Sequence, residues 1–314
     1  MKTMLFGCIS KVVLIWLLFA VLSFGWLAPA WAASTIDGPG NADGPGNARE
    51  ILRAGVAAFQ EGDYLLAVEQ FSQAIQLYPN YEAAYGNRCL AQIYLADYEA
   101  AVADCTQALQ ISSTDSEAYL NRGLAYYRAG NPVQALADYN QLLQLKPHDF
   151  RAYYNRGLAQ SQLQAYREAI VDFGEALRQV SPLDHAILAE IYNDRGLAQL
   201  GLEHWPQAVA DFAQAIQFSK SDFRAYYNRG CAHHHQGNLT AALNDFSQVL
   251  RMTPTHAHAY LSRGLIQQQL GNPEAALADL QHAAQFFRNQ GATVAYQQTL
   301  TLIEKLRGFS SAIG

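Results

Sequence analysis

Clustered positive charge is missing from this sequence. The 314 residues include 21 lysines and arginines against 27 aspartates and glutamates, a formal net charge of −6. Nucleic-acid binding needs grouped basic side chains, so this balance argues against a nucleic-acid partner. The motifs G-x-S-x-G and H-E-x-x-H and a phosphate-binding loop are also missing. We therefore predict that the chain is no enzyme and has no catalytic residue, metal site or cofactor.

Cysteine is scarce as well, which excludes a disulfide-rich scaffold. Four cysteines are spread over the chain, and Cys8 falls in the N-terminal segment. The other three, Cys89, Cys105 and Cys231, are too few and odd in number for a disulfide framework.

A long apolar run occurs only once, near the N-terminus. Val12–Leu27 follows two lysines and leads to the small-residue site Ala30-Trp31-Ala32, as in a secretory signal peptide. We predict that residues 1–32 are a cleaved signal peptide. The protein would then be periplasmic, or lie in the thylakoid lumen if its source is photosynthetic. The alternative is an uncleaved run that anchors the chain in a membrane.

A segment rich in glycine and proline follows the predicted cleavage site. Residues 37–48 read DGPGNADGPGNA, and glycine and proline at this density interrupt both helix and strand. We predict a flexible linker over residues 33–47. Cleavage leaves 282 residues with 19 basic and 27 acidic side chains, a formal charge of −8. Without a second long apolar run, we expect no stable membrane insertion of this mature chain.

Three columns of residues recur along the rest of the chain. A small residue returns every 34 residues, with one interval of 39, at Gly55, Cys89, Gly123, Gly157, Gly196, Gly230 and Gly264. Twelve residues later stand Ala67, Ala101, Ala135, Ala169, Ala208, Ala242 and Ala276. Four further on stand Phe71, Cys105, Tyr139, Phe173, Phe212, Phe246 and Leu280. A step of four keeps residues on one helical face, and a period in this range indicates stacked structural units.

Turn residues separate the two helical segments of each unit. They include Gly62-Asp63, Gly130-Asn131-Pro132, Gly237-Asn238 and Gly271-Asn272-Pro273. Asp or Asn suits a helix N-cap, and proline is tolerated at the first helical position. Each unit is therefore predicted to be a helix, a tight turn and a second helix.

This pattern resembles the tetratricopeptide repeat in seven copies over residues 48–290. The resemblance includes the early aromatic residue, which is Tyr85, Tyr119, Tyr153, Tyr192, Tyr226 and Tyr260. It implies an all-α fold, a right-handed α-solenoid of helix-turn-helix repeats with a concave groove that accepts peptides. The predicted repeats are 48–81, 82–115, 116–149, 150–183, 189–222, 223–256 and 257–290, with five extra residues at 184–188.

Two segments depart from the regular repeat. Ser181 has the features of a helix cap, followed by Pro182 and Asp184 as a first-turn proline and a first-turn acid. We therefore expect the first helix of the fifth repeat to be longer by more than a turn. After the last repeat, residues 291–314 keep helical periodicity. We expect a capping helix there that covers the open face of the seventh repeat.

An arginine precedes the small column, and an aspartate precedes the aromatic column sixteen residues later. The first repeat has neither, so pairing within each repeat leaves no residue unmatched. We predict six structural ion pairs, namely Arg88–Asp104, Arg122–Asp138, Arg156–Asp172, Arg195–Asp211, Arg229–Asp245 and Arg263–Asp279. Because each arginine has its own acid, we prefer a structural role over a basic ligand-binding stripe.

A second face of the first helices is implied by the resemblance to line the groove. Tyr153 shares the face of Gly157 and is expected to pack inward, whereas Tyr154 is rotated by about 100°. The candidate groove residues are Phe59, Ile93, Tyr94, Tyr127, Arg151, Tyr154, Leu158, Arg224, Tyr227 and His234. Such a groove suits a protein or peptide segment with apolar or aromatic side chains.

Two clusters could suggest other chemistry. Cys89 and Cys105 occupy touching columns of one repeat, so they are either a disulfide in an exported protein or a pair of buried free thiols. The histidines of AHHHQG, residues 232–237, follow one another and point around the helix, so they do not converge on a metal.

The leading hypothesis is an exported scaffold that binds a partner protein along its groove, in the assembly or maintenance of envelope or membrane complexes. One alternative is a homo-oligomeric structural protein. The other is an accessory repeat array of an enzyme, which is disfavoured because residues 48–290 leave little chain for chemistry.

Overall fold

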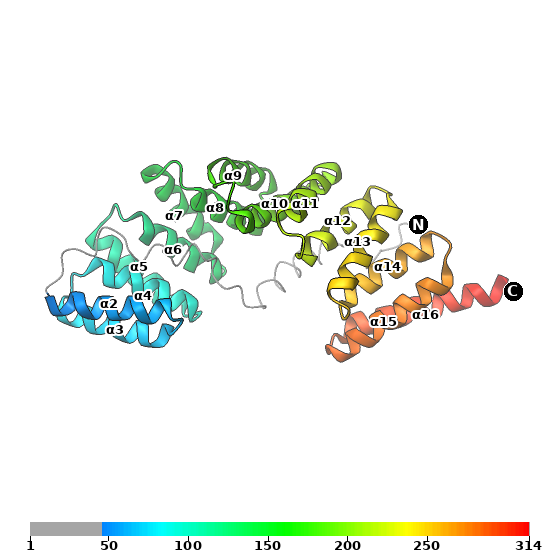
Figure 1. The fold of residues 1–314 in the computed structure, drawn as a ribbon, viewed down its shortest axis with the longest axis horizontal. Helices are drawn as coiled ribbons and strands as arrows, with labels where there is room; N and C mark the ends of the chain where they lie inside the picture. The colour runs from blue at the N-terminus through cyan, green and yellow to red at the C-terminus, as the bar shows by residue number, and fades with distance from the viewer. Residues whose placement is uncertain (1–45, 314) are drawn as a thin grey trace. The chain divides into compact units, whose positions relative to one another are not determined.

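The computed structural model describes residues 46–313, which are folded into helices without any strand (Figure 1). The predicted signal peptide and most of the predicted linker lie outside the described residues. The last two residues of the predicted linker, Gly46 and Asn47, already belong to the first described helix. Among residues 46–313, no helix combines the length and the apolar character that a membrane span requires.

The described helices fall into two compact units, which we treat separately. The N-terminal unit, residues 46–179, consists of α2 (Gly46–Gln60), α3 (Tyr64–Leu77), α4 (Glu82–Tyr94), α5 (Tyr98–Ile111), α6 (Ser116–Arg128), α7 (Pro132–Leu145), α8 (Phe150–Gln162) and α9 (Tyr166–Gln179). The C-terminal unit, residues 180–313, consists of α10 (His185–Gly201), α11 (Trp205–Phe218), α12 (Phe223–His235), α13 (Leu239–Met252), α14 (Ala257–Gln269), α15 (Pro273–Asn289) and α16 (Thr293–Ile313).

Helices that follow one another in the chain pack together throughout each unit. In the N-terminal unit the first helices of neighbouring repeats, α2, α4, α6 and α8, also contact one another, and they do so more than the second helices of neighbouring repeats. A stack whose first helices are closer together than its second helices curves toward the first helices. We call their side of the N-terminal unit the inner face.

The small and aromatic columns form the contact between the two helices of a repeat. The aromatic rings of Phe71, Tyr139, Phe173, Phe212 and Phe246 have no exposed surface. In each of these repeats a ring carbon lies only 2.6–3.1 Å from the point that a Cβ on the facing glycine would occupy. The rings fill the space that glycine leaves open, and a larger side chain there would have to displace them.

The turn residues cap the second helices in several repeats. Asp63 accepts a hydrogen bond from the backbone N–H of Leu66, and Asn238 accepts one from Ala241. Asn131 and Asn272 stand at the N-cap without a side-chain hydrogen bond, and each is followed by a proline in the first helical position. The punctuation of the sequence thus marks the helix starts even where the side chain makes no cap.

The extra five residues lengthen α10, as expected, but they start it at a different residue. α10 has 17 residues against 13 in α8 or α12, a difference of just over one helical turn. The predicted cap at Ser181 is wrong, because Asp184 is the N-cap and Pro182 lies before the helix. Residues 181–184 form a turn, in which the backbone N–H of Asp184 donates a hydrogen bond to the carbonyl of Ser181 at 3.0 Å.

The C-terminal helix α16 packs on α15, as its periodicity predicts. Ile303 and Leu306 are buried in one apolar cluster with Leu261 and Leu265 of α14 and with Phe287 of α15. This helix therefore covers the side of the seventh repeat that has no further repeat beside it.

Candidate functional site

The structure joins each of the six arginines to the aspartate sixteen residues later in the same repeat. The closest N···O distances are 2.5–2.7 Å in all six pairs. Arg156 shows the geometry, since its Nε and Nη2 atoms donate to the two oxygens of Asp172, both at 2.7 Å. The aspartate side chains are only 5–9 % exposed, while the arginines keep 19–24 %. Two-point pairing of this kind fixes the orientation of the two helices.

Each of these arginines contacts a tyrosine ring as well as its paired carboxylate. The guanidinium carbons lie 5.3–5.7 Å from the ring centres of Tyr85, Tyr119, Tyr153, Tyr192, Tyr226 and Tyr260. Hydrogen bonds with the paired aspartate raise the pKa of Arg122 and Arg156. These tyrosines are half-buried beside a cation. Tyr153 is therefore less buried than the sequence analysis predicts.

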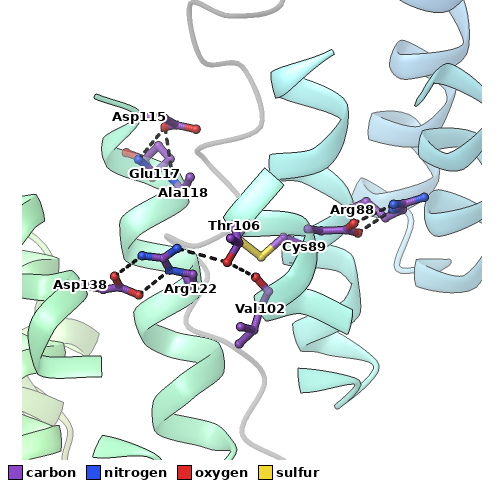
Figure 2. Close-up of a disulfide and its surroundings, with 11 residues drawn as sticks. Arg88, Cys89, Val102, Thr106, Asp115, Glu117, Ala118, Arg122 and Asp138 are labelled. Atoms are coloured by element: carbon purple, nitrogen blue, oxygen red, sulfur yellow. Dashed lines mark hydrogen bonds and ion pairs between the residues drawn. A yellow bond between two sulfur atoms is a disulfide. The ribbon is translucent and has the colours of Figure 1, made fainter. Parts of the chain in front are cut away.

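Four of the six arginines have a third partner in the preceding repeat, which was not predicted from the sequence. The Nη1 atom of Arg88 donates to Ser72 at 2.8 Å, that of Arg122 to Thr106 at 3.2 Å, and that of Arg156 to Asn140 at 2.7 Å. Figure 2 shows Arg122 between Asp138 and Thr106, whose own hydroxyl donates to the carbonyl of Val102. The guanidinium thus joins neighbouring repeats as well as the two helices of one repeat.

Arg151, a predicted groove residue, forms ion pairs with two carboxylates. Its Nη2 atom lies 2.6 Å from Asp149 and 2.7 Å from Glu117, which is 34 residues earlier on the neighbouring first helix. Burial acts to lower the pKa of Arg151, but hydrogen bonds with these two carboxylates outweigh it and raise the pKa. The guanidinium therefore serves to join α6 to α8.

The second copy of the DFRAYYNRG sequence builds a related cluster in the C-terminal unit. Arg224 pairs with Asp222 at 2.8 Å, and Glu190, 34 residues before Arg224, stands in the place of Glu117. Burial, with a smaller contribution from Asp194, raises the pKa of Glu190 to about 7, although Arg224 acts to lower it. The duplicated sequence thus repeats an arginine–carboxylate arrangement as well as a packing pattern.

The raised pKa of Glu190 predicts a loss of stability as the pH rises. The folded state favours the protonated carboxyl of Glu190, so this residue stabilises the fold fully below its ordinary pKa of 4.5. That stabilisation is lost as the pH rises through about 7. The midpoint of thermal unfolding should therefore fall between about pH 5 and about pH 8 more in the wild type than in Glu190→Gln. Glu304→Gln, at an exposed position, controls for the loss of one charge, and equal pH dependence in all three proteins would contradict this prediction.

Aromatic side chains gather at one end of the inner face. The ring of Tyr94, at the end of α4, lies 5.1 Å from that of Phe59 and 4.6 Å from that of Tyr64, between ring centres. Burial raises the pKa of Tyr94 to about 12, and Tyr64 adds to the effect. Phe59 is buried, whereas Tyr94, Tyr127 and Leu158 are half-buried. Of the predicted groove residues in the N-terminal unit, these three keep exposed surface outside the ion-pair cluster.

Other predicted groove residues are buried. Tyr154 is 4 % exposed, with its ring 6.0 Å from that of Phe173, and Tyr227 is 6 % exposed, 5.5 Å from Phe246. The prediction that these two tyrosines offer an open binding surface is wrong, as it is for Phe59 and Ile93. A first helix contacts both its own second helix and the neighbouring first helices. A residue that faces away from the second helix can therefore be buried against a neighbouring first helix.

The histidines of α12 are engaged separately. The ring of His235 stacks on that of Trp205 at 4.4 Å, and His234, a predicted groove residue that is half-buried, lies 3.3 Å from the side-chain nitrogen of Gln269. Within residues 46–313, no three side chains of the metal-binding types come together.

Cys89 and Cys105 form a disulfide between α4 and α5, with their Cα atoms 5.5 Å apart (Figure 2). Both residues are fully buried. Of the two states that the sequence left open, the structure has the oxidised one. Cys231 is buried.

Similarity to solved structures shows the fold of this chain. The protein YrrB, described as a tetratricopeptide repeat protein with an unusual peptide-binding site, is 24 % identical with a TM-score of 0.52, over 62 % of this chain and 97 % of YrrB. A tetratricopeptide repeat protein from Parabacteroides merdae is 22 % identical, with a TM-score of 0.61 over 82 % and 100 % of the two chains. PilF of Pseudomonas aeruginosa is 16 % identical, with a TM-score of 0.59 over 70 % and 96 %.

Comparison with family models gives the same result at the level of sequence, although no curated protein matches this chain. Models of the tetratricopeptide repeat match residues 51–81, 116–149, 150–179, 193–246 and 237–291. Together these matches cover more than half of the chain and fall on the helix pairs described above. The chain belongs to the tetratricopeptide repeat family.

Proposed function

We propose that this protein is an exported scaffold that binds a partner protein through the inner face of its N-terminal unit. Membership of the tetratricopeptide repeat family supports a role in protein–protein interaction. The description of YrrB as a protein with a peptide-binding site supports a peptide segment as the bound element. We propose no catalytic role.

The aromatic cluster at the end of α4 is the reason for proposing this surface as the partner-binding site. The rings of Phe59 and Tyr64 both pack against that of Tyr94, which remains half-buried. Aromatic rings that are fixed before binding lose little conformational entropy, and a tyrosine offers both an apolar ring and a hydrogen-bonding hydroxyl. The partner segment should therefore contain apolar or aromatic side chains.

The disulfide supports the export of this chain. Disulfides form and persist mainly in oxidising compartments outside the cytosol. Cys89 and Cys105 are joined in the core of a repeat, where an oxidising environment allows the fold to close around them. With the predicted signal peptide, this leads us to propose an exported protein that acts in the assembly or maintenance of envelope or membrane complexes. Fractionation of cells, with detection of the processed chain, tests this location.

Crosslinking followed by pull-down from the exported fraction tests the inner face. We expect Tyr94→Ala/Tyr127→Ala to lose the captured partner. The matched control is Val133→Ala/Val171→Ala, which removes apolar surface of two second helices in the same unit, since each valine is 63 % exposed. Thermal unfolding of each variant must show equal folded fractions at the temperature of the experiment. Capture of the same partners by wild type and the tyrosine variant would contradict the proposed surface.

A further inference from the structure

Repeat 2 is the one repeat in which cysteines replace both the small residue and the aromatic residue. Repeats 1, 3, 4, 5 and 6 place a glycine against a ring, and repeat 7 places Gly264 against Leu280. Cys89 and Cys105 occupy the same two positions, sixteen residues apart, and are bonded to each other. The disulfide therefore stands where the other repeats have their main contact between the two helices.

Loss of this bond would leave repeat 2 less well packed than the other repeats. An aromatic ring fills the space in front of the facing glycine so fully that even a Cβ would collide with it. Two thiols occupy less volume than a ring, and two non-bonded sulfur atoms cannot approach as closely as bonded ones. A reduced repeat 2 thus combines poor filling with repulsion at the contact between α4 and α5.

The disulfide also packs beneath residues of the inner face. It belongs to a buried cluster with Ile93 of α4 and with Leu124 and Ala125 of α6, and Tyr127 packs against this cluster. Tyr94 follows Ile93 directly at the end of α4. A change in the closure of α4 on α5 therefore acts on two of the tyrosines that we assign to the partner surface.

We propose that Cys89 and Cys105 form a redox switch that sets how firmly repeat 2 is closed, and with it the order of the inner face at Tyr94 and Tyr127. The consequence for partner binding rests on the proposed function, whereas the change in closure does not. The oxidised pair holds α4 on α5. The reduced pair lets this repeat open locally while the other repeats keep their own contacts between the two helices.

The chemical step is thiol–disulfide exchange with a protein or small-molecule disulfide. The thiolate of one cysteine attacks the donor disulfide, which releases one donor thiol and leaves a mixed disulfide. The second cysteine, as thiolate, then displaces the other donor thiol. The cysteine pair gives up two protons and two electrons, and the donor takes up both. Because both sulfurs are buried, exchange in either direction requires α4 and α5 to separate first.

Hydrogen exchange of the purified protein, with and without reductant, tests this switch. We expect reduction to speed amide exchange in α4 and α5 on the order of 100-fold, as for loss of a crosslink that closes a loop of this length. Exchange in α14 and α15 should not change. Mass spectrometry, which detects the two hydrogens gained on reduction, verifies the state of the cysteines in each sample.

Two variants provide the controls. Cys89→Gly/Cys105→Phe rebuilds the contact of the other repeats, and its exchange should match that of the oxidised wild type with or without reductant. Cys89→Ala/Cys105→Ala should exchange as fast as the reduced wild type in both conditions. Equal exchange of α4 and α5 in oxidised and reduced wild type would overturn the proposal. If the proposed function alone fails, partner capture does not depend on Tyr94 and Tyr127, while the difference in exchange persists.

Discussion

Replacing Phe173 with alanine should lower the free energy of unfolding by about 4 kcal/mol, the cost of removing a buried phenylalanine and leaving a cavity. Its ring is fully buried and fills the space in front of Gly157, where its nearest carbon is 2.8 Å from the position of a Cβ. Urea unfolding followed by circular dichroism, fitted with a model of interacting neighbouring repeats, measures the loss. Val171→Ala, on the same helix at a position that is 63 % exposed, should cost no more than about 0.5 kcal/mol.

A second substitution separates the loss of packing from a general weakening of the helix. Gly157→Ala in the wild type forces a methyl group against the ring of Phe173 and should cost about 1–3 kcal/mol. In the Phe173→Ala background the ring is gone, so the same substitution should become neutral or stabilising, because alanine favours helix by about 1 kcal/mol over glycine. Additive costs would show that the two columns do not share one contact.

The columns explain why the sequence predicts the architecture so well. A glycine and an aromatic residue sixteen positions apart recur in five repeats, and each pair makes the same contact between two helices. The turn residues then mark the starts of second helices, as at Asp63 and Asn238. The start of α10 is an exception, because Ser181, Pro182 and Asp184 have the spacing of a helix start, whereas Asp184 itself is the N-cap.

The surface of the repeats is harder to predict than their core. A helical wheel for one helix places Tyr153 and Tyr154 on different faces, but it carries no information on how many neighbours the helix has. In the structure Tyr154 packs against Phe173 and Tyr153 lies beside Arg156. The order of exposure that we inferred is therefore reversed.

The hydroxyl and amide partners of the arginines could have been found from the sequence. Ser72, Thr106, Asn140 and Ser247 each stand sixteen residues before an arginine of the series, and each accepts a hydrogen bond from it. The corresponding residue before Arg229 is Ala213, which offers no side-chain acceptor. Pairing by opposite charge does not reveal this column, because its members are uncharged.

Breaking one arginine–aspartate pair should have the second largest effect. Asp172→Ala should cost about 3 kcal/mol, because it leaves the guanidinium of Arg156 without its charged partner in a largely buried place. Arg156→Ala should cost a similar amount, since Asp172 is then buried without its cation. The exposure that Arg156 retains, 22 % of its side chain, places both values at the low end for buried pairs.

A double-mutant cycle at this pair tests the structural role of all six. If the two residues act mainly on each other, Arg156→Ala/Asp172→Ala should cost about 2 kcal/mol less than the sum of the single variants. The pair Glu175 and Arg178, on the exposed surface of the same repeat, is the matched control and should show a coupling of no more than about 0.5 kcal/mol. Strict additivity at Arg156 and Asp172 would mean that their contact contributes nothing beyond their separate packing. The repeated arginine and aspartate columns would then need a reason other than the orientation of the helices, and a ligand-binding stripe would again be the stronger interpretation.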